Sequence, residues 1–202
     1  IKTWERKVAK LVKQARFKTP SACVEDIVYL PDRKLSRDRI ARYAECDWVE
    51  KCEVMVIISK TGGGKSYLCQ ALGNAACRKL IEVRHARLAG ICEELNRARA
   101  AADGSYYELM DGLKTIPLLL VDDFMTTPIT TQNAVDLFEI MEARESLAAT
   151  LIASQLEPNE WYLRIEGELM ADSILNRIAT GARYIDLEGP NMREYFAKKK
   201  VG

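Results

Sequence analysis

The sequence of 202 residues lacks any long apolar run and any marked excess of charge of one sign. A membrane-spanning helix needs roughly 18–20 consecutive apolar residues, and a secretory leader needs a basic start followed by an apolar segment. Neither pattern occurs in the sequence. The net charge of +1 excludes no class of partner. With 48% hydrophobic and 29% charged residues, the composition predicts one globular core with at most a small appendage.

Metal-binding and disulfide patterns are also lacking. None of the six cysteines forms a C-x-x-C pair, and the chain contains a single histidine, His85. A zinc site or a disulfide framework would need several such residues at suitable spacing. We therefore expect reduced thiols in a cytoplasmic protein.

Basic residues are concentrated at the start of the chain. Residues 1–18 carry many Lys and Arg against one acid, Glu5, and their apolar residues recur at helical spacing. The segment predicts an amphipathic helix whose basic face is either solvated or in contact with nucleic-acid phosphates. A second basic cluster, residues 198–200, lies in the expected tail at 198–202. Because the chain starts with Ile1 and not methionine, we expect further residues to precede it.

Strands and helices alternate along the chain after a connector. The N-terminal region is predicted at 1–45, with a helix at 36–45, and the core at 46–197. In the core we expect strands at 54–59, 81–86, 117–123, 149–154 and 183–187, and helices at 65–80, 87–102, 131–146 and 167–180. Such alternation predicts an α/β fold, in which helices flank a parallel five-stranded sheet.

A glycine-rich turn follows the first of these strands. The stretch ISKTGGGKSYL, residues 58–68, matches the phosphate-binding pattern G-x-x-x-x-G-K-[ST] except that Ser59 replaces the first glycine. Lys65 would reach the β- and γ-phosphates of ATP, and the Ser66 hydroxyl would bind Mg²⁺. The alternative for this loop alone is a flexible glycine turn beside a chance lysine. The residues predicted to bind the nucleotide are Thr61, Gly62, Gly63, Gly64, Lys65, Ser66 and Tyr67.

The stretch LLLVDD, residues 118–123, supports the same site. An apolar strand that ends in an acid holds the magnesium ion in P-loop NTPases, so Asp122 is predicted to orient the metal-bound waters. Asp123 lies where many ATPases have a glutamate that activates the attacking water. The two motifs together predict a site for ATP and Mg²⁺ with Lys65, Asp122 and Asp123 as catalytic residues and Ser66 and Asp122 as metal-binding residues.

Several longer segments give the chain a resemblance to one family. They are PDRKL (31–35), TGGGKSYL (61–68), ADGSYYELM (102–110), LLLVDDF (118–124), SQLEPNEW (154–161), MADSILNRI (170–178) and DLEGPNMRE (186–194). With them the chain resembles the IstB-like helper ATPases of insertion-sequence transposons. These are relatives of the DnaC and DnaI helicase loaders in the AAA+ superfamily. The resemblance runs from about residue 20 to 196, and its last three segments are specific to the helper group.

The resemblance implies an AAA+-type fold without a C-terminal lid subdomain, and roles for three further residues. Gln155 resembles the polar sensor of the γ-phosphate at the end of the fourth strand. Arg177 resembles the arginine that reaches the γ-phosphate bound by a neighbouring subunit. Arg193 resembles a basic position near the end of the family pattern, a second sensor. Without the resemblance, Gln155 would be a strand cap and Arg177 a helix-surface charge.

Two positions depart from the pattern of the relatives. Ser59 replaces a glycine in the loop, and Met125 stands where relatives usually carry glycine after the aromatic residue of DDF. We expect Met125 to stiffen the loop after the strand that ends in Asp122. These departures bear on ATP hydrolysis more than on ATP binding.

Three functions follow as alternatives. The first is a slow, DNA-stimulated ATPase that helps a transposase and assembles on duplex DNA as a homo-oligomer, with ATP at the subunit interfaces. Duplex is favoured because no aromatic stacking platform accompanies the basic residues. The second is a loader that binds a replicative helicase. The third is an ATP-gated scaffold with little hydrolysis, because Asp123 is one methylene shorter than glutamate.

Overall fold

The computed structural model describes residues 1–201, which form one parallel sheet with helices on both sides. The five strands are ordered β2-β3-β4-β1-β5. Their bounds are β1 (Val54–Ser59), β2 (Val83–Arg87), β3 (Leu118–Asp122), β4 (Ala149–Ser154) and β5 (Arg183–Leu187). The five-stranded α/β fold predicted from the sequence is confirmed, and β1, β4 and β5 have the predicted bounds.

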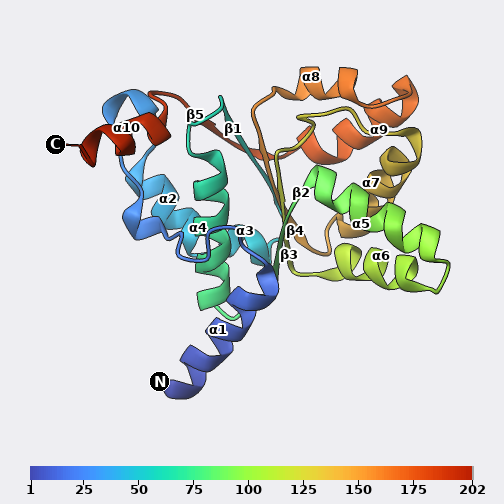
Figure 1. Cartoon of the computed structure of the whole chain (residues 1–202), viewed down its shortest axis with the longest axis horizontal. Helices are drawn as coiled ribbons and strands as arrows, with labels where there is room; N and C mark the ends of the chain where they lie inside the picture. The colour runs from blue at the N-terminus through green and yellow to red at the C-terminus, as the bar shows by residue number, and fades with distance from the viewer. Residues whose placement is uncertain (202) are drawn as a thin grey trace.

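Helices cover both faces of the sheet, which Figure 1 shows nearly edge-on. On one side lie α1 (Lys2–Ala15), α2 (Arg37–Ala44), α3 (Asp47–Glu50), α4 (Lys65–Arg78) and α10 (Met192–Lys199). On the other side lie α5 (Leu88–Ala101), α6 (Ser105–Thr115), α7 (Thr131–Arg144), α8 (Pro158–Trp161) and α9 (Glu168–Ala179). Single 3₁₀ turns are η1 (Val24–Asp26), η2 (Pro31–Arg33) and η3 (Tyr162–Arg164). Within residues 1–201, no helix is both long and apolar enough to span a bilayer.

Successive residues of each strand pack on opposite faces of the sheet. In β1, Met55 and Ile57 belong to the cluster that includes α4, whereas Val56 and Ile58 belong to the cluster that includes α7 and α9. Both faces of the strand are therefore buried. This is why its sequence is apolar throughout and does not alternate with polar residues.

Some helices were not expected from the sequence. The helix predicted at 87–102 is followed by a separate helix, α6, because Ala102 and Gly104 adopt left-handed φ angles of 51° and 88°. The short helices α3 and α8 and the C-terminal α10 were also missed. Because α10 ends at Lys199, Lys198 and Lys199 are helical and not part of a tail. Gly202 lies outside the described residues.

The connector after α1 packs along α4. The Thr19 N–H donates to Gln70 Oε1 at 2.7 Å, and Asn74 Nδ2 donates to the carbonyl oxygens of Pro20 and Ala22 at 2.6 and 2.9 Å. These amide side chains are buried on α4, so the connector satisfies their hydrogen bonds. The helix that starts at Lys65 is thus held between the sheet and the connector.

Phe17, which follows α1, packs between α4 and the sheet. Gly73 of α4 makes this possible, because a Cβ atom there would lie 2.5 Å from Leu120 Cδ1 and 2.8 Å from the Phe17 ring. Both neighbours are buried. Only a residue without a side chain allows α4, Phe17 and β3 to approach this closely.

We predict that Gly73→Ala lowers the free energy of unfolding by about 1–3 kcal/mol, because the added methyl group overpacks the core. Gly112→Ala is the matched control. A Cβ atom at Gly112, inside α6, has no neighbour within 4 Å, and alanine there should raise the free energy of unfolding by up to about 1 kcal/mol. Urea unfolding of both variants measures the two effects. Equal free energies of unfolding would contradict close packing at Gly73.

Candidate nucleotide-binding site

Three strands end at the edge of the sheet where predicted site residues lie. Strands β1, β3 and β4 end at Ser59, Asp122 and Ser154. Because β4 pairs in parallel with both β1 and β3, these carboxyl ends lie side by side. The glycine loop leaves β1 and enters α4 at Lys65. The amino end of α4, with its unpaired backbone N–H groups, therefore faces the same edge.

The glycines are required by the shape of the loop. Gly62 and Gly64 adopt φ angles of 82° and 93°, which side chains of other residues disfavour. A Cβ atom on Gly63 would lie 1.7 Å from the Ser59 hydroxyl oxygen. That hydroxyl donates to the Lys60 carbonyl oxygen at 3.1 Å. Ser59, the departure from the usual pattern, is thus accommodated beneath Gly63.

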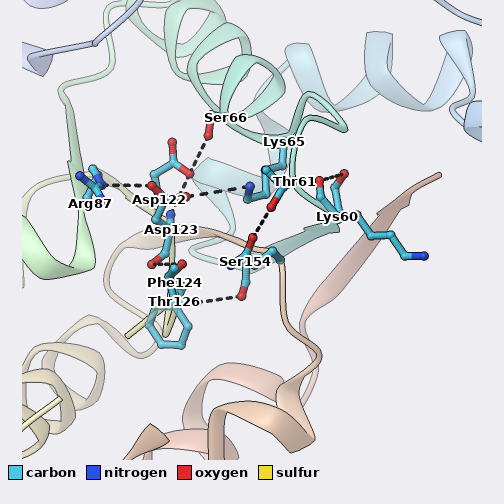
Figure 2. A network of polar contacts seen from close by, with 12 residues as sticks. Lys60, Thr61, Lys65, Ser66, Arg87, Asp122, Asp123, Phe124, Thr126 and Ser154 are labelled. Carbon is cyan, nitrogen blue, oxygen red and sulfur yellow. Dashed lines mark hydrogen bonds and ion pairs between the residues drawn. The ribbon is translucent and has the colours of Figure 1, made fainter. Parts of the chain in front are cut away.

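Lys65, Ser66 and Asp122 come together at the start of α4 (Figure 2). The Ser66 hydroxyl donates to Asp122 Oδ1 at 3.0 Å. The Lys65 side chain is only 9% exposed, and its Nζ lies 3.9 Å from Asp123 Oδ1, which is too long for a hydrogen bond. A hydroxyl beside a carboxylate is the hard oxygen set that Mg²⁺ prefers. The buried ammonium and the glycine cradle fit the phosphates of a nucleotide.

Asp122 is held by several hydrogen-bond donors. Besides Ser66, the Asp123 N–H donates to Oδ1 at 2.8 Å, and His85 Nε2 lies 3.3 Å from Oδ2. Burial by itself raises the pKa of Asp122, but the hydrogen bonds from His85, Asp123 N–H and Ser66 outweigh burial and lower that pKa below its ordinary value. Asp122 is therefore kept ionised, which binding of a metal ion would require.

Asp123 turns away from the strand with a φ of 46°. Its Oδ2 accepts a hydrogen bond from Arg87 Nε at 3.0 Å (Figure 2). Arg87 is the last residue of β2 and pairs in register with Asp122. The carboxylate of Asp123 therefore lies between two cations, Arg87 and Lys65, at the rim of the site.

Gln155 also lies at the loop. Its Oε1 accepts a hydrogen bond from the Thr61 hydroxyl at 2.6 Å. The preceding residue, Ser154, donates from its hydroxyl to the Phe124 carbonyl oxygen at 2.8 Å and accepts from Trp161 Nε1 at 3.1 Å. The end of β4 is thus tied to the loop after β3 on one side and to the glycine loop on the other.

Met125 adopts the left-handed conformation that a glycine would occupy without strain. Its φ is 57°, and its side chain is fully buried. The preceding Phe124 packs edge-to-face on Trp161, with ring centroids 4.7 Å apart. Packing in the core therefore compensates for the backbone strain of Met125.

Two predicted residues contribute less to the loop than expected. The Tyr67 hydroxyl accepts a hydrogen bond from the Cys23 N–H at 3.3 Å, so its side chain is directed to the connector and only its backbone remains for a ligand. Arg193 is exposed on α10. Its neighbour Met192 is closer to the loop, because the Met192 N–H donates to the Gly62 carbonyl oxygen at 2.8 Å.

Arg177 lies at the opposite end of the sheet. Its guanidinium donates to Glu145 at 2.8 Å and to Glu142 at 3.0 Å, and lies 4.9 Å from the centroid of the Phe138 ring. It lines a cavity of about 180 Å³ together with Glu53, which precedes β1. The length of β1 separates this end from the glycine loop by on the order of 15–20 Å. The structure therefore does not bring Arg177 to the loop of its own chain.

Four site residues were missed from the sequence. His85 and Arg87 approach the two acids, and the Asn191 side chain lies against Gly62. Arg33 is buried, and its Nη2 donates to the Gly63 carbonyl oxygen at 2.9 Å. Burial lowers the pKa of Arg33. Arg33 and Asn191 belong to PDRKL and DLEGPNMRE, so the segments that carry the resemblance contained a signal for both.

We predict that Gly63→Ala lowers the free energy of unfolding by about 1–3 kcal/mol, because the new methyl group collides with the Ser59 hydroxyl. Adding Ser59→Gly should recover part of this loss, with a coupling energy of about 0.5–3 kcal/mol between the two changes. Ser59→Gly alone should cost about 1 kcal/mol or less. Chemical denaturation of the two single variants and the double variant measures the coupling. Additive effects would show that the loop does not rest on Ser59.

The fold resembles those of several solved structures. One is a DNA replication initiation factor (TM-score 0.73, 20% identity), of which the chain covers 90% of its own length and 54% of that protein. Another is DnaI (TM-score 0.68, 21% identity), with 90% of this chain and 92% of that chain covered. The chain thus spans about half the length of the initiation factor. At these identities the likeness shows the fold alone.

Sequence comparison is more specific. The chain is 34% identical over 196 residues to an insertion-sequence ATP-binding protein of Sinorhizobium fredii. The aligned region covers 97% of this chain and 79% of that relative. A protein of similar description from Mycobacterium tuberculosis is 27% identical over 187 residues, with 92% of this chain and 73% of that relative covered. The family of IstB-like ATP binding proteins matches residues 2–200. The chain therefore belongs to the IstB-like ATP binding protein family.

Proposed function

We propose that the chain is an ATP-binding and ATP-hydrolysing helper protein of an insertion-sequence transposase, which binds and assembles on duplex DNA under the control of the nucleotide. Membership of the IstB-like family and the insertion-sequence relatives support this function. The observation that carries it is the 3.0 Å hydrogen bond from Ser66 to Asp122 beside the buried Lys65. This contact joins the phosphate loop to the metal-binding acid.

In this proposal the chain's own groups bind the triphosphate. Backbone N–H groups from Thr61 to Ser66 bind phosphate oxygens at the positive end of α4. The Lys65 ammonium binds the β- and γ-phosphates in place of its long contact with Asp123. Ser66 and Asp122 hold Mg²⁺, which when bound neutralises phosphate charge during transfer.

Hydrolysis is assigned to Asp123 and Gln155. Asp123 accepts a proton from the attacking water, and the Gln155 amide, already at the loop through Thr61, holds that water near the γ-phosphate. Asp123 is one methylene shorter than glutamate and is bound by Arg87. Slow turnover is the consequence we expect.

Duplex DNA is assigned chiefly to α1. The basic side chains Lys2, Arg6, Lys7, Lys10 and Lys13 are exposed, and within residues 1–201 none of them forms an ion pair with a carboxylate. Such a helix suits phosphate contacts along DNA. The basic cluster at 198–200 lies near the other terminus, far from the start of α1 in Figure 1. The two basic segments would therefore contact separate stretches of DNA.

Assembly is assigned to Arg177. Within one chain, this arginine lies at the far end of the sheet from the glycine loop. There it forms ion pairs with two carboxylates. In a homo-oligomer, its guanidinium would face the γ-phosphate bound by the loop of the adjacent subunit. A permanently charged, planar group suits this role. Arg193, exposed on α10, is the proposed second sensor.

The helicase loader is the second candidate, favoured by the likeness of the fold to DnaI. It would use the same ATP site but respond to single-stranded DNA and bind a replicative helicase. An ATP-gated scaffold is the third candidate. The strained, buried Met125 and the engaged Asp123 favour it.

The test of the function is to measure the rate of ATP hydrolysis without DNA, with duplex DNA and with single-stranded DNA. Lys65→Ala serves as the blank. We expect Lys65→Ala to weaken ATP binding by about 10–100-fold, because a charged phosphate contact is lost, and to abolish hydrolysis. Lys60→Ala is the matched control, since this exposed lysine points away from Asp122 in Figure 2. Unchanged affinity in Lys65→Ala would disprove the site.

The DNA dependence of the rate separates the three candidates. Stimulation by duplex DNA would support the transposition helper. A response mainly to single strands would support the loader. If the chain binds ATP but hydrolyses none under any of these conditions, the result would support the ATP-gated scaffold.

We predict that Arg177→Ala leaves ATP binding intact but lowers assembly-dependent hydrolysis by on the order of 10³–10⁵-fold. Arg97→Ala, at an exposed arginine of α5, is the control and should have little effect. Mixing Arg177→Ala with Lys65→Ala should partly restore hydrolysis, because some interfaces then combine an intact lysine with an intact arginine. Absence of rescue at every mixing ratio would refute a role in the adjacent subunit.

A further inference from the structure

The two carboxylate oxygens of Asp122 have different partners. Oδ1 accepts from the Ser66 hydroxyl at 3.0 Å and from the Asp123 N–H at 2.8 Å. Oδ2 lies 3.3 Å from His85 Nε2, its one recorded hydrogen-bond partner within residues 1–201. The carboxylate is buried. Without His85, the hydrogen bonds of Oδ2 would have to come from water or a ligand.

The sheet directs His85 to this oxygen. In the parallel pairing of β2 with β3, His85 lies opposite Leu120 and Arg87 lies opposite Asp122. Side chains at alternate positions share a face, so His85 and Asp122 both point toward α4. The imidazole on β2 therefore reaches the side chain that lies two residues beyond Leu120 on β3, which is Asp122. It is the side chain of the only histidine in the chain.

The imidazole is also held on its other side. His85 is 6% exposed, and its ring centroid lies 6.1 Å from that of Phe17. Phe17 is itself confined, because Gly73 of α4 allows its ring to approach the helix directly. Phe17, two residues after the end of α1, therefore packs against the ring that contacts Asp122.

We propose that His85 is a positioning residue for magnesium binding: its Nε2–H fixes Oδ2 of Asp122 so that Oδ1 is presented to the Ser66 hydroxyl and the metal-bound waters. This role rests on the proposed ATP site. A carboxylate that binds a metal is commonly oriented by a hydrogen bond to its other oxygen, and loss of such a partner weakens metal binding by about 10–100-fold. The ring form that fills this role carries its proton on Nε2, since a neutral imidazole with its proton on Nδ1 would present an acceptor to the carboxylate.

A role in packing alone is the competing explanation. A phenylalanine at position 85 would keep an aromatic ring beside Phe17 but could not donate to Asp122. Glutamine would keep an N–H donor of similar reach, whereas asparagine is one methylene shorter and would not reach Oδ2. The three substitutions therefore distinguish the effect of the hydrogen bond on magnesium binding from the effect of the ring volume.

The test measures the binding of a fluorescent ATP analogue in EDTA and across a titration with Mg²⁺. We expect His85→Phe to raise the Mg²⁺ concentration at half-effect by about 10–100-fold, while affinity in EDTA changes little. His85→Gln should lie close to the wild type, and His85→Asn close to His85→Phe. A Mg²⁺ dependence in His85→Phe equal to that of the wild type would overturn the proposal.

Further comparisons control for the packing of the ring and for a variant that does not fold. Phe17→Leu loosens the packing of the ring without removing the donor, so it should leave the Mg²⁺ dependence near that of the wild type. If His85→Phe does not fold, as judged by its melting temperature, the comparison of His85→Gln with His85→Asn decides, and equal Mg²⁺ dependence in these two would overturn the role. If the wild type binds the analogue without any response to Mg²⁺, the magnesium part of the proposed function fails together with this inference.

Discussion

Parallel hydrogen bonding of β4 to both β1 and β3 is the constraint on which the site depends. Because these strands run in the same direction, Ser59, Asp122 and Ser154 finish at one edge. The glycine loop, Asp122 and Gln155 therefore lie close together at the end of the sheet. The amino end of α4 faces the same edge, so the dipole of the helix acts on any anion held there.

Charge at this edge is balanced by contacts between distant segments. Arg87 and Lys65 approach Asp123 from β2 and α4, and His85 approaches Asp122. Arg33 reaches from the connector to the carbonyl oxygen of Gly63. The connector is therefore part of the site, because a buried guanidinium needs acceptors and the loop supplies one of them. This explains why the family resemblance starts well before the strand that leads into the loop.

The glycine loop lies at the carboxyl ends of the strands, and Arg177 lies by the amino end of β1. A rigid sheet separates the two groups, so flexing of one chain would not join them. An assembly in which one chain's Arg177 end meets the next chain's loop end satisfies this geometry. If Arg177 acts as proposed, ATP hydrolysis would depend on neighbouring subunits.

The sequence by itself determined the succession of the five strands along the chain, the glycine loop and the acids at the end of β3. These features are local, because period, glycine spacing and an acid after an apolar run are properties of neighbouring residues. The break between α5 and α6 escaped prediction, since it depends on the backbone of Ala102 and Gly104 rather than on periodicity.

Only the tertiary structure decided which distant side chains meet. It placed His85 on Asp122, Arg33 on Gly63 and Arg177 on its two glutamates. The register of β2 on β3 and the packing of the connector and of α9 set these contacts. No pattern along the chain encodes a register or a packing distance, because both result from the burial of many residues at once.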